Sequence, residues 1–181
     1  MRETVLYIGM SLDGYIADCD GGVGWMGGQD PTDESAGSYP EFLHTVDTVM
    51  MGRNTYHQIV TELSPEEWVY AGLRSYVITH RLQPDADGII FTNESPGALV
   101  DRLKVQPGRD IWICGGAELV HQLLREDKID RFHIAVLPIL LGSGIRLFGS
   151  DGRKIPLTLT GTQVYNGITE LIYRKRENCS G

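Results

Sequence analysis

A chain of 181 residues, 41% of them hydrophobic and 22% charged, has the size and composition of one globular domain, and we expect a single domain over residues 1–181. The formal net charge of −8 argues against nucleic acid or an anionic membrane as a partner. No apolar stretch reaches membrane-spanning length, no signal-peptide pattern opens the chain, and the three cysteines lack metal-ligand spacing. We therefore expect a cytoplasmic protein that binds a small molecule and has no metal site.

The first predicted element is a strand over residues 5–10, a nearly continuous apolar run. The segment Ser11-Leu12-Asp13-Gly14 follows it and predicts a turn. The Asp13 carboxylate either shapes this turn or contacts a substrate at the edge of a cofactor, and we favour the turn. Residues 18–38 are rich in glycine and acidic side chains and lack periodicity, which predicts a long loop.

Helices and strands alternate along the rest of the chain. Helical patterns and capping residues predict helices over residues 40–46, 54–63, 95–104 and 117–125. Apolar runs predict strands over residues 48–51, 75–79, 88–92, 110–114, 131–141, 157–165 and 168–174. Asn166-Gly167, between the last two strands, is a strong hairpin signal. This order predicts an α/β domain with a mostly parallel central sheet, a C-terminal antiparallel hairpin and helices on both faces.

Three segments, residues 51–56, 77–81 and 113–118, have the character of a binding site for an anionic dinucleotide. Each follows a predicted strand, and the first and third open into helices, so all three can lie at one edge of the sheet. The start of a helix offers free N–H groups to a phosphate. Arg53, His80 and Arg81 add cationic or donor groups, which an acidic protein needs for holding phosphate.

Two glycine patterns compete for the role of the phosphate-binding turn. Residues 22–27, Gly-Val-Gly-Trp-Met-Gly, match the G-x-G-x-x-G pattern of dinucleotide-binding proteins. That pattern works only between a strand and a helix, and neither flank fits here, so we interpret it as a loop. Gly115-Gly116 does join a predicted strand to a predicted helix, and the missing Cβ atoms let a pyrophosphate approach the backbone.

The order of these three segments resembles the dihydrofolate reductase fold, and most closely its branch that contains the reductase domain of riboflavin biosynthesis, the RibD C-terminal domain family. Residues 10–17, Met-Ser-Leu-Asp-Gly-Tyr-Ile-Ala, and residues 137–144, Leu-Pro-Ile-Leu-Leu-Gly-Ser-Gly, are similar to that branch specifically. The resemblance covers nearly the whole chain. It implies a three-layer fold and NADPH as the cofactor, since the 2′-phosphate of NADPH matches the cationic groups better than NADH does.

The resemblance also implies roles for individual cofactor-binding residues. Arg53 and Thr55 match the positions that hold the adenosine 2′-phosphate and a neighbouring phosphate. The positions beside the adenine ribose are Thr79, His80 and Arg81. The pyrophosphate-binding turn matches Gly115, Gly116, Ala117 and Glu118, and the nicotinamide carboxamide matches Ile16 and Ala17.

The implied activity is an NADPH-dependent reductase similar to 5-amino-6-(5-phosphoribosylamino)uracil reductase, with hydride transfer to a small heterocyclic or ribose-derived substrate. Two alternatives stay open: a dihydrofolate reductase, and a nucleotide-binding protein without turnover. A folate reductase needs a carboxylate a few residues after its loop tryptophan, and Asp30 is the candidate catalytic acid here, unless it is a solvated loop residue. The resemblance and the apolar run over residues 134–141 predict a homodimer, although a buried strand explains the same run.

Overall fold

The computed structural model describes residues 1–81, 83–149 and 154–176 of the chain. Its strands are β1 (Thr4–Ser11), β2 (Tyr15–Ala17), β3 (Val46–Gly52), β4 (Arg74–Ile78), β5 (Ile89–Thr92), β6 (Asp110–Gly115), β7 (Arg131–Leu137), β8 (Ile145–Arg146), β9 (Leu157–Tyr165) and β10 (Ile168–Lys175). Its helices are α1 (Tyr39–Thr45), α2 (Arg53–Gln58), the π-helical turn η1 (Ile59–Leu63), α3 (Pro96–Lys104) and α4 (Ala117–Arg125). None of the helices in these ranges is long and apolar enough to cross a membrane.

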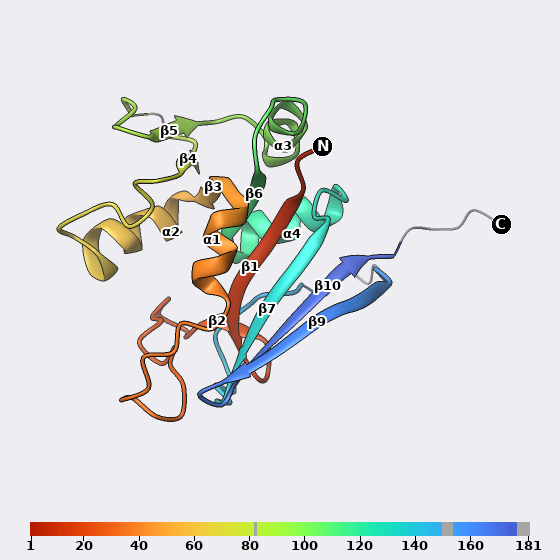
Figure 1. The fold of residues 1–181 in the computed structure, drawn as a ribbon. Helices are drawn as coiled ribbons and strands as arrows, with labels where there is room; N and C mark the ends of the chain where they lie inside the picture. The colour runs from red at the N-terminus through yellow and green to blue at the C-terminus, as the bar shows by residue number, and fades with distance from the viewer. Residues whose placement is uncertain (82, 150–153, 177–181) are drawn as a thin grey trace.

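Within the described ranges, eight strands form one sheet in the order β5-β4-β3-β6-β1-β7-β10-β9. The strands from β5 to β7 run parallel to their neighbours, whereas β10 is antiparallel to both β7 and β9. In Figure 1, β1, β7, β10 and β9 lie side by side, with α1 in front of the sheet and α4 behind it. The predicted α/β fold, with its mostly parallel sheet and C-terminal antiparallel hairpin, is confirmed.

Both faces of the sheet carry a hydrophobic core, because successive side chains of a buried strand point to opposite faces. On one face the sheet packs against α3 and α4 through a cluster that includes Leu6, Ile113, Leu103 and Leu123. On the other face it packs against α1, α2 and η1 through a cluster that includes Tyr7, Trp112, Phe42 and Ile59. Adjacent residues of β6 therefore belong to different cores, and the sheet is covered on both sides as predicted.

The strand predicted over residues 131–141 is shorter in the structure, because β7 ends at Leu137. Pro138 follows, and proline has no N–H group to donate to a neighbouring strand. β7 lies between β1 and β10 inside the sheet, and this position accounts for its apolar side chains. The run therefore adds no support to the homodimer, which stays a prediction that light scattering would check.

The loop predicted over residues 18–38 contains neither helix nor strand. The G-x-G-x-x-G pattern lies inside this loop, and no helix begins directly after it, so the context that a phosphate-binding turn requires is missing. The sequence analysis missed two short strands, β2 and β8, which pair in an antiparallel manner with Tyr15 opposite Arg146 and Ala17 opposite Ile145. This pair fixes the point from which the long loop departs.

Candidate functional site

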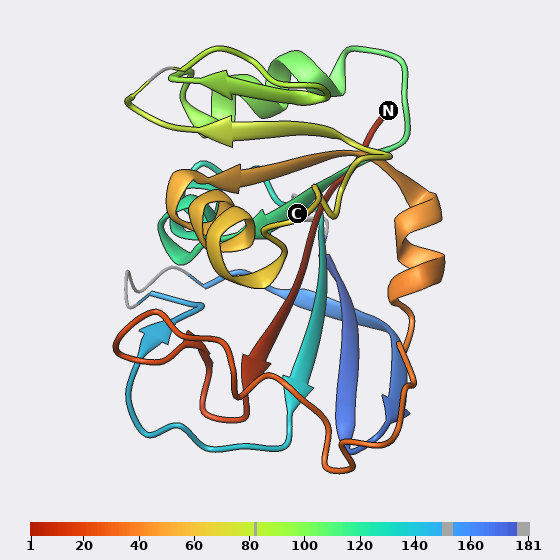
Figure 2. The same cartoon turned by 90° about the vertical axis from the view of Figure 1, so that its left-hand side faces the viewer.

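A large pocket lies at the edge of the sheet where several parallel strands end. The ends of β3, β4 and β6 contribute Gly52, Ile78 and Gly115 to its lining. Figure 2 shows β3, β4 and β5 pointing toward this common edge, with α2 beside them. The pocket has a volume of about 1690 Å³. Sites for one small ligand measure about 300–1,000 Å³, so this pocket has room for a dinucleotide and a second molecule.

All eleven residues that the resemblance implies for cofactor binding line this one pocket, although they come from four separate parts of the chain. They are Ile16, Ala17, Arg53, Thr55, Thr79, His80, Arg81, Gly115, Gly116, Ala117 and Glu118. The parallel pairing of β3 with both β4 and β6 brings the three predicted segments together, because each segment follows one of these strands.

The glycines between β6 and α4 are required by close contacts. Gly115 has φ +129°, a conformation that side chains with a Cβ rarely adopt, and the Gly115–Gly116 peptide bond is cis. A Cβ added to Gly116 would lie 3.3 Å from Thr55 Oγ1. Gly52, just before α2, faces the same turn, since its own Cβ would lie 3.9 Å from the Gly116 nitrogen. Two helix starts thus approach each other here with their backbones open toward the pocket.

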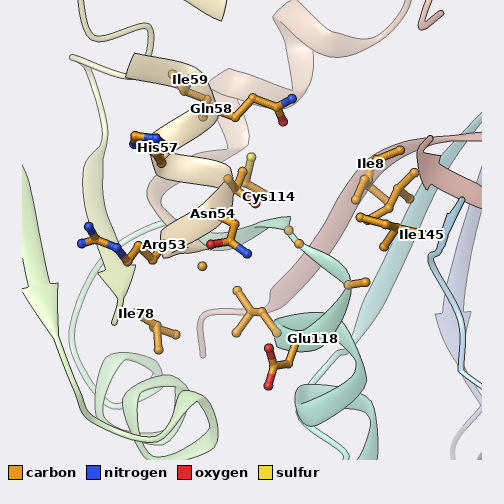
Figure 3. Close-up of a pocket in the computed structure, with 18 of the residues that line it drawn as sticks. Ile8, Arg53, Asn54, His57, Gln58, Ile59, Ile78, Cys114, Glu118 and Ile145 are labelled. Atoms are coloured by element: carbon orange, nitrogen blue, oxygen red, sulfur yellow. The ribbon is translucent and has the colours of Figure 1, made fainter. Parts of the chain in front are cut away.

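Cationic groups gather at the β3–β4 side of the pocket. Arg53, the first residue of α2, and His80 and Arg81, which follow β4, are all exposed. Thr79 is buried, and its hydroxyl accepts a hydrogen bond of 3.1 Å from the Arg81 backbone N–H, which holds this segment in a turn. In Figure 3, the side chains of Arg53 and His57 extend to the same side of the pocket. The arrangement suits an anionic group that is held at the surface.

The opposite side of the pocket is apolar. Ile16 and Ala17 are buried on β2, and Ile8 of β1 and Ile145 of β8 also line the pocket. Figure 3 shows Ile8 and Ile145 across the pocket from Arg53. Met26, from the long loop, reaches the lining as well, whereas the side chain of the neighbouring Trp25 donates its Nε1–H to the Gly22 carbonyl at 3.1 Å.

The two candidate acids do not line the pocket. Asp30 is exposed, and its carboxylate accepts hydrogen bonds from the Thr32 backbone N–H at 2.8 Å and hydroxyl at 2.7 Å. These hydrogen bonds hold the pKa of Asp30 below its usual value, so it is a charged loop residue. The structure thus gives Asp30 no position from which to protonate a bound substrate.

Asp13 shapes a turn, which is the interpretation that the sequence favoured. Its carboxylate accepts hydrogen bonds from the Ser11 hydroxyl at 2.6 Å and from the backbone N–H groups of Leu141 and Gly142 at 3.1 and 2.7 Å. The hydrogen bond from the Ser11 hydroxyl is the main cause that lowers the pKa of Asp13 to about 2, and the hydrogen bonds from these backbone groups add to it. Asp13 therefore ties the segment after β7 to the turn after β1.

Four aromatic residues that the sequence analysis missed form a continuous wall of the pocket. They are Tyr7, Tyr39, Tyr70 and Trp112, here called the aromatic wall. The Trp112 ring meets the Tyr70 ring edge-on at 5.0 Å and the Tyr39 ring at 5.9 Å, and Tyr7 lies 5.7 Å from Tyr39. The alternation in β6 could have placed Trp112 and Cys114 on one face, but no local pattern connects them to Tyr39 or Tyr70.

The titratable groups along the aromatic wall are neutral at ordinary pH. Burial raises the pKa of the Cys114 thiol to about 11 and outweighs its hydrogen bond with the Tyr70 hydroxyl, 3.7 Å away. Burial, followed by the nearby Cys114 sulfur, raises the pKa of Tyr39 to about 12 and moves that of Tyr70 above its usual range. A charged nucleophile is therefore absent from these three positions.

A buried carboxylate lies behind the aromatic wall. Glu170 of β10 is fully buried and accepts hydrogen bonds from the Tyr7 hydroxyl at 3.0 Å and the Ser38 hydroxyl at 2.5 Å. The His133 Nε2 atom lies 3.1 Å from the same carboxylate and 3.0 Å from the Ser38 oxygen. Burial lowers the pKa of His133, so the ring is neutral. Because the Glu170 carboxylate only accepts hydrogen bonds, we assign the ring proton to Nε2. This network ties the end of the long loop to the sheet.

Comparison with known proteins gives consistent matches over nearly the whole chain. The family model of the RibD C-terminal domain matches residues 3–171. The uncharacterized protein YwjB of Bacillus subtilis strain 168 is 41% identical over 177 residues, which cover 95% of this chain and 97% of that protein. A solved structure from Shewanella sp. PV-4, provisionally assigned to riboflavin biosynthesis, has a TM-score of 0.83 at 25% identity and covers 97% of this chain and 100% of its own.

A more distant structure shows the same fold within a longer protein. The diaminohydroxyphosphoribosylaminopyrimidine deaminase/5-amino-6-(5-phosphoribosylamino)uracil reductase of Thermotoga maritima has a TM-score of 0.72 at 14% identity. The match covers 97% of this chain and 57% of the Thermotoga chain.

Proposed function

Because this chain belongs to the RibD C-terminal domain family, a family of reductases, we propose that it is an NADPH-dependent reductase that transfers hydride to a small heterocyclic or ribose-derived substrate. The observation that carries the proposal is the order of the sheet. Turns after β4, β3 and β6 are neighbours at one edge, so an extended dinucleotide can cross them in sequence toward β2.

The residues at this edge fit the charge and shape of NADPH. Arg53, with His80 and Arg81, supplies the positive charge that a 2′-phosphate requires. Gly115 and Gly116 leave the backbone open where a pyrophosphate would approach, since a Cβ on Gly116 would already contact Thr55.

The protein's part in the reaction is to bind the cofactor and the substrate and to orient them toward each other. NADPH supplies the hydride when it is bound. Ile16 and Ala17 on β2 form an apolar end of the pocket for the nicotinamide, away from the phosphate-binding cations. Because Asp30 lies outside the pocket and the raised pKa of the Cys114 thiol makes it a weak acid, we assign the proton that completes the reduction to solvent. The exposure of Asp30 also disfavours a dihydrofolate reductase.

The test compares NADPH with NADH by thermal unfolding of the whole chain. A ligand at one hundred times its Kd stabilises the folded state by about 2.7 kcal/mol, and we expect this shift for NADPH at concentrations where NADH gives little. Arg53→Ala should weaken NADPH far more than NADH. Arg74→Ala, at an exposed arginine outside the pocket lining, is the matched control. Equal shifts for both cofactors would remove the 2′-phosphate assignment.

Turnover separates the reductase from a nucleotide-binding protein. We expect the oxidation of NADPH, followed by absorbance, to depend on an added aminopyrimidine substrate. If the chain binds NADPH tightly but fails to oxidise it with any substrate of this class, it is instead a nucleotide-binding protein.

A further inference from the structure

We propose that the substrate of this reductase is a flat, uncharged heterocycle that carries no phosphate group, held against the aromatic wall beside Cys114. The inference rests on the proposed function, because it assigns the part of the pocket that NADPH leaves free. It departs from the phosphorylated compound in the name of the Thermotoga relative.

The aromatic wall offers ring surfaces rather than hydrogen-bonding groups. The Trp112 Nε1–H is already donated to the Tyr7 carbonyl at 2.9 Å, and the Tyr7 hydroxyl to Glu170 at 3.0 Å. The Tyr70 hydroxyl lies 3.7 Å from the Cys114 sulfur. Tyr39 is half-buried, and its hydroxyl has no hydrogen-bond partner among the described residues, so it is free to contact a ligand. Such a surface binds planar rings by stacking and edge contacts.

The cationic groups of the pocket are far from this wall. Arg53 follows β3, which is adjacent to β6, and Trp112 of β6 pairs with Val49, four residues before Arg53 and so about 13 Å away along the strand. Arg81 follows β4, whereas Tyr7 belongs to β1. In the sheet order, β4 and β1 are separated by three strand spacings. Three spacings of about 4.8 Å amount to about 14 Å. When a phosphate of NADPH binds the cations that follow β3 and β4, a substrate at the aromatic wall therefore has no cation to bind.

The charges near the aromatic wall also disfavour an anion. Among the described residues, no lysine or arginine lies in the pocket lining on β1, β6 or α1. The Glu170 carboxylate is buried directly behind Tyr7, and the loop residue Asp20 lines the pocket. A phosphate placed here would lose its hydration, meet no positive charge and face a like charge nearby.

The experiment measures binding of three probes to the whole chain by isothermal titration calorimetry, with and without saturating NADP⁺. The probes are pterin, 5-amino-6-ribosylaminouracil and 5-amino-6-(5-phosphoribosylamino)uracil, of which the last two differ only by the phosphate. We expect the phosphate to weaken binding by about tenfold or more. Equal or tighter binding of the phosphorylated probe would overturn the inference, and so would failure of all three probes to bind.

A pair of variants tests whether the missing charge at the wall sets this preference. Tyr39→Arg adds a cation to the half-buried position on α1, and we expect it to remove the penalty for the phosphorylated probe. Tyr39→Phe keeps the ring without the hydroxyl and should preserve the penalty. A penalty that is unchanged in Tyr39→Arg would contradict the assignment of the wall as the substrate site.

Thermal shifts with NADPH on the same samples keep the two proposals apart. If NADPH fails to stabilise the chain, the proposed function fails, while the probe preference can still be read in the absence of cofactor. NADPH can also stabilise the wild type and Tyr39→Arg equally. If the wild type then binds the phosphorylated probe more tightly than the other two probes, only the substrate inference fails.

Discussion

Single residues in this chain have their roles assigned by what they contact rather than by their chemical type. Asp13 and Asp30 are both loop aspartates that follow recognisable motifs. Asp13 accepts hydrogen bonds from two backbone N–H groups of the segment after β7, so it positions that segment. Asp30 contacts only Thr32 through its carboxylate, at an exposed point of the long loop.

Asp30→Asn therefore should retain most of the wild-type turnover. The amide oxygen of asparagine can still accept the hydrogen bonds from Thr32, and Asp30 lies outside the pocket lining. Steady-state rates with 5-amino-6-ribosylaminouracil and with dihydrofolate would check this. Strong dihydrofolate turnover that falls by orders of magnitude in Asp30→Asn would instead identify a folate reductase.

At the scale of elements, the strand–turn–helix unit formed by β6, Gly115-Gly116 and α4 distinguishes this pocket from a simple loop site. Gly116→Val should abolish NADPH binding, because its Cβ would lie 3.3 Å from Thr55 Oγ1 and its two methyl groups would project further into the turn. The backbone at Gly116 has φ −82°, which valine tolerates, so we expect the chain to fold.

Gly24→Ala is the matched control for the competing glycine pattern. A Cβ at Gly24 meets no atom within 4 Å, so the variant should bind NADPH as the wild type does. Thermal shifts with NADPH would compare the two variants. If Gly24→Ala lost binding and Gly116→Val kept it, the phosphates would have to bind at the long loop.

For the whole molecule, the buried network around Glu170 predicts how stability changes with pH. Burial favours the neutral carboxyl, but hydrogen bonds from Ser38, His133 and Tyr7 outweigh it and hold the pKa of Glu170 below its usual value. Burial lowers the pKa of His133. The unfolded chain therefore binds more protons than the folded chain in acid. Stability should fall below about pH 6.5 through His133, and further below about pH 4.3 through Glu170.

Urea unfolding at pH 7, pH 4.5 and pH 3 would measure this dependence. Glu170→Gln should cost about 2 kcal/mol at pH 7, because a buried charged acceptor is lost, and it should remove the further decline below about pH 4.3. Glu66→Gln, at an exposed position, is the control and should follow the wild type. An identical pH dependence of Glu170→Gln and the wild type would show that the network does not govern acid stability.

Local patterns were enough to predict most elements and the three segments that line the pocket. The alternation of strands and helices, the terminal hairpin and the turn at Gly115-Gly116 each depend on residues that are adjacent in the sequence. The predicted strand over residues 131–141 was too long, because its apolar run continues past Pro138 while the hydrogen-bonded ladder ends at Leu137. Hydrophobicity thus located the strand, and backbone chemistry set its end.

By itself, then, the sequence determined the α/β class, the family resemblance and the three segments that meet at the edge of the sheet, since periodicity and turn chemistry are local properties. Only the tertiary structure decided that Tyr7, Tyr39, Tyr70 and Trp112 form one wall, and that Glu170 meets His133 and Ser38 beneath it. These contacts join residues that are far apart in the chain. They depend on β6 lying beside β1 and β10 beside β7, an order that follows from burying both faces of the sheet and that no short segment encodes.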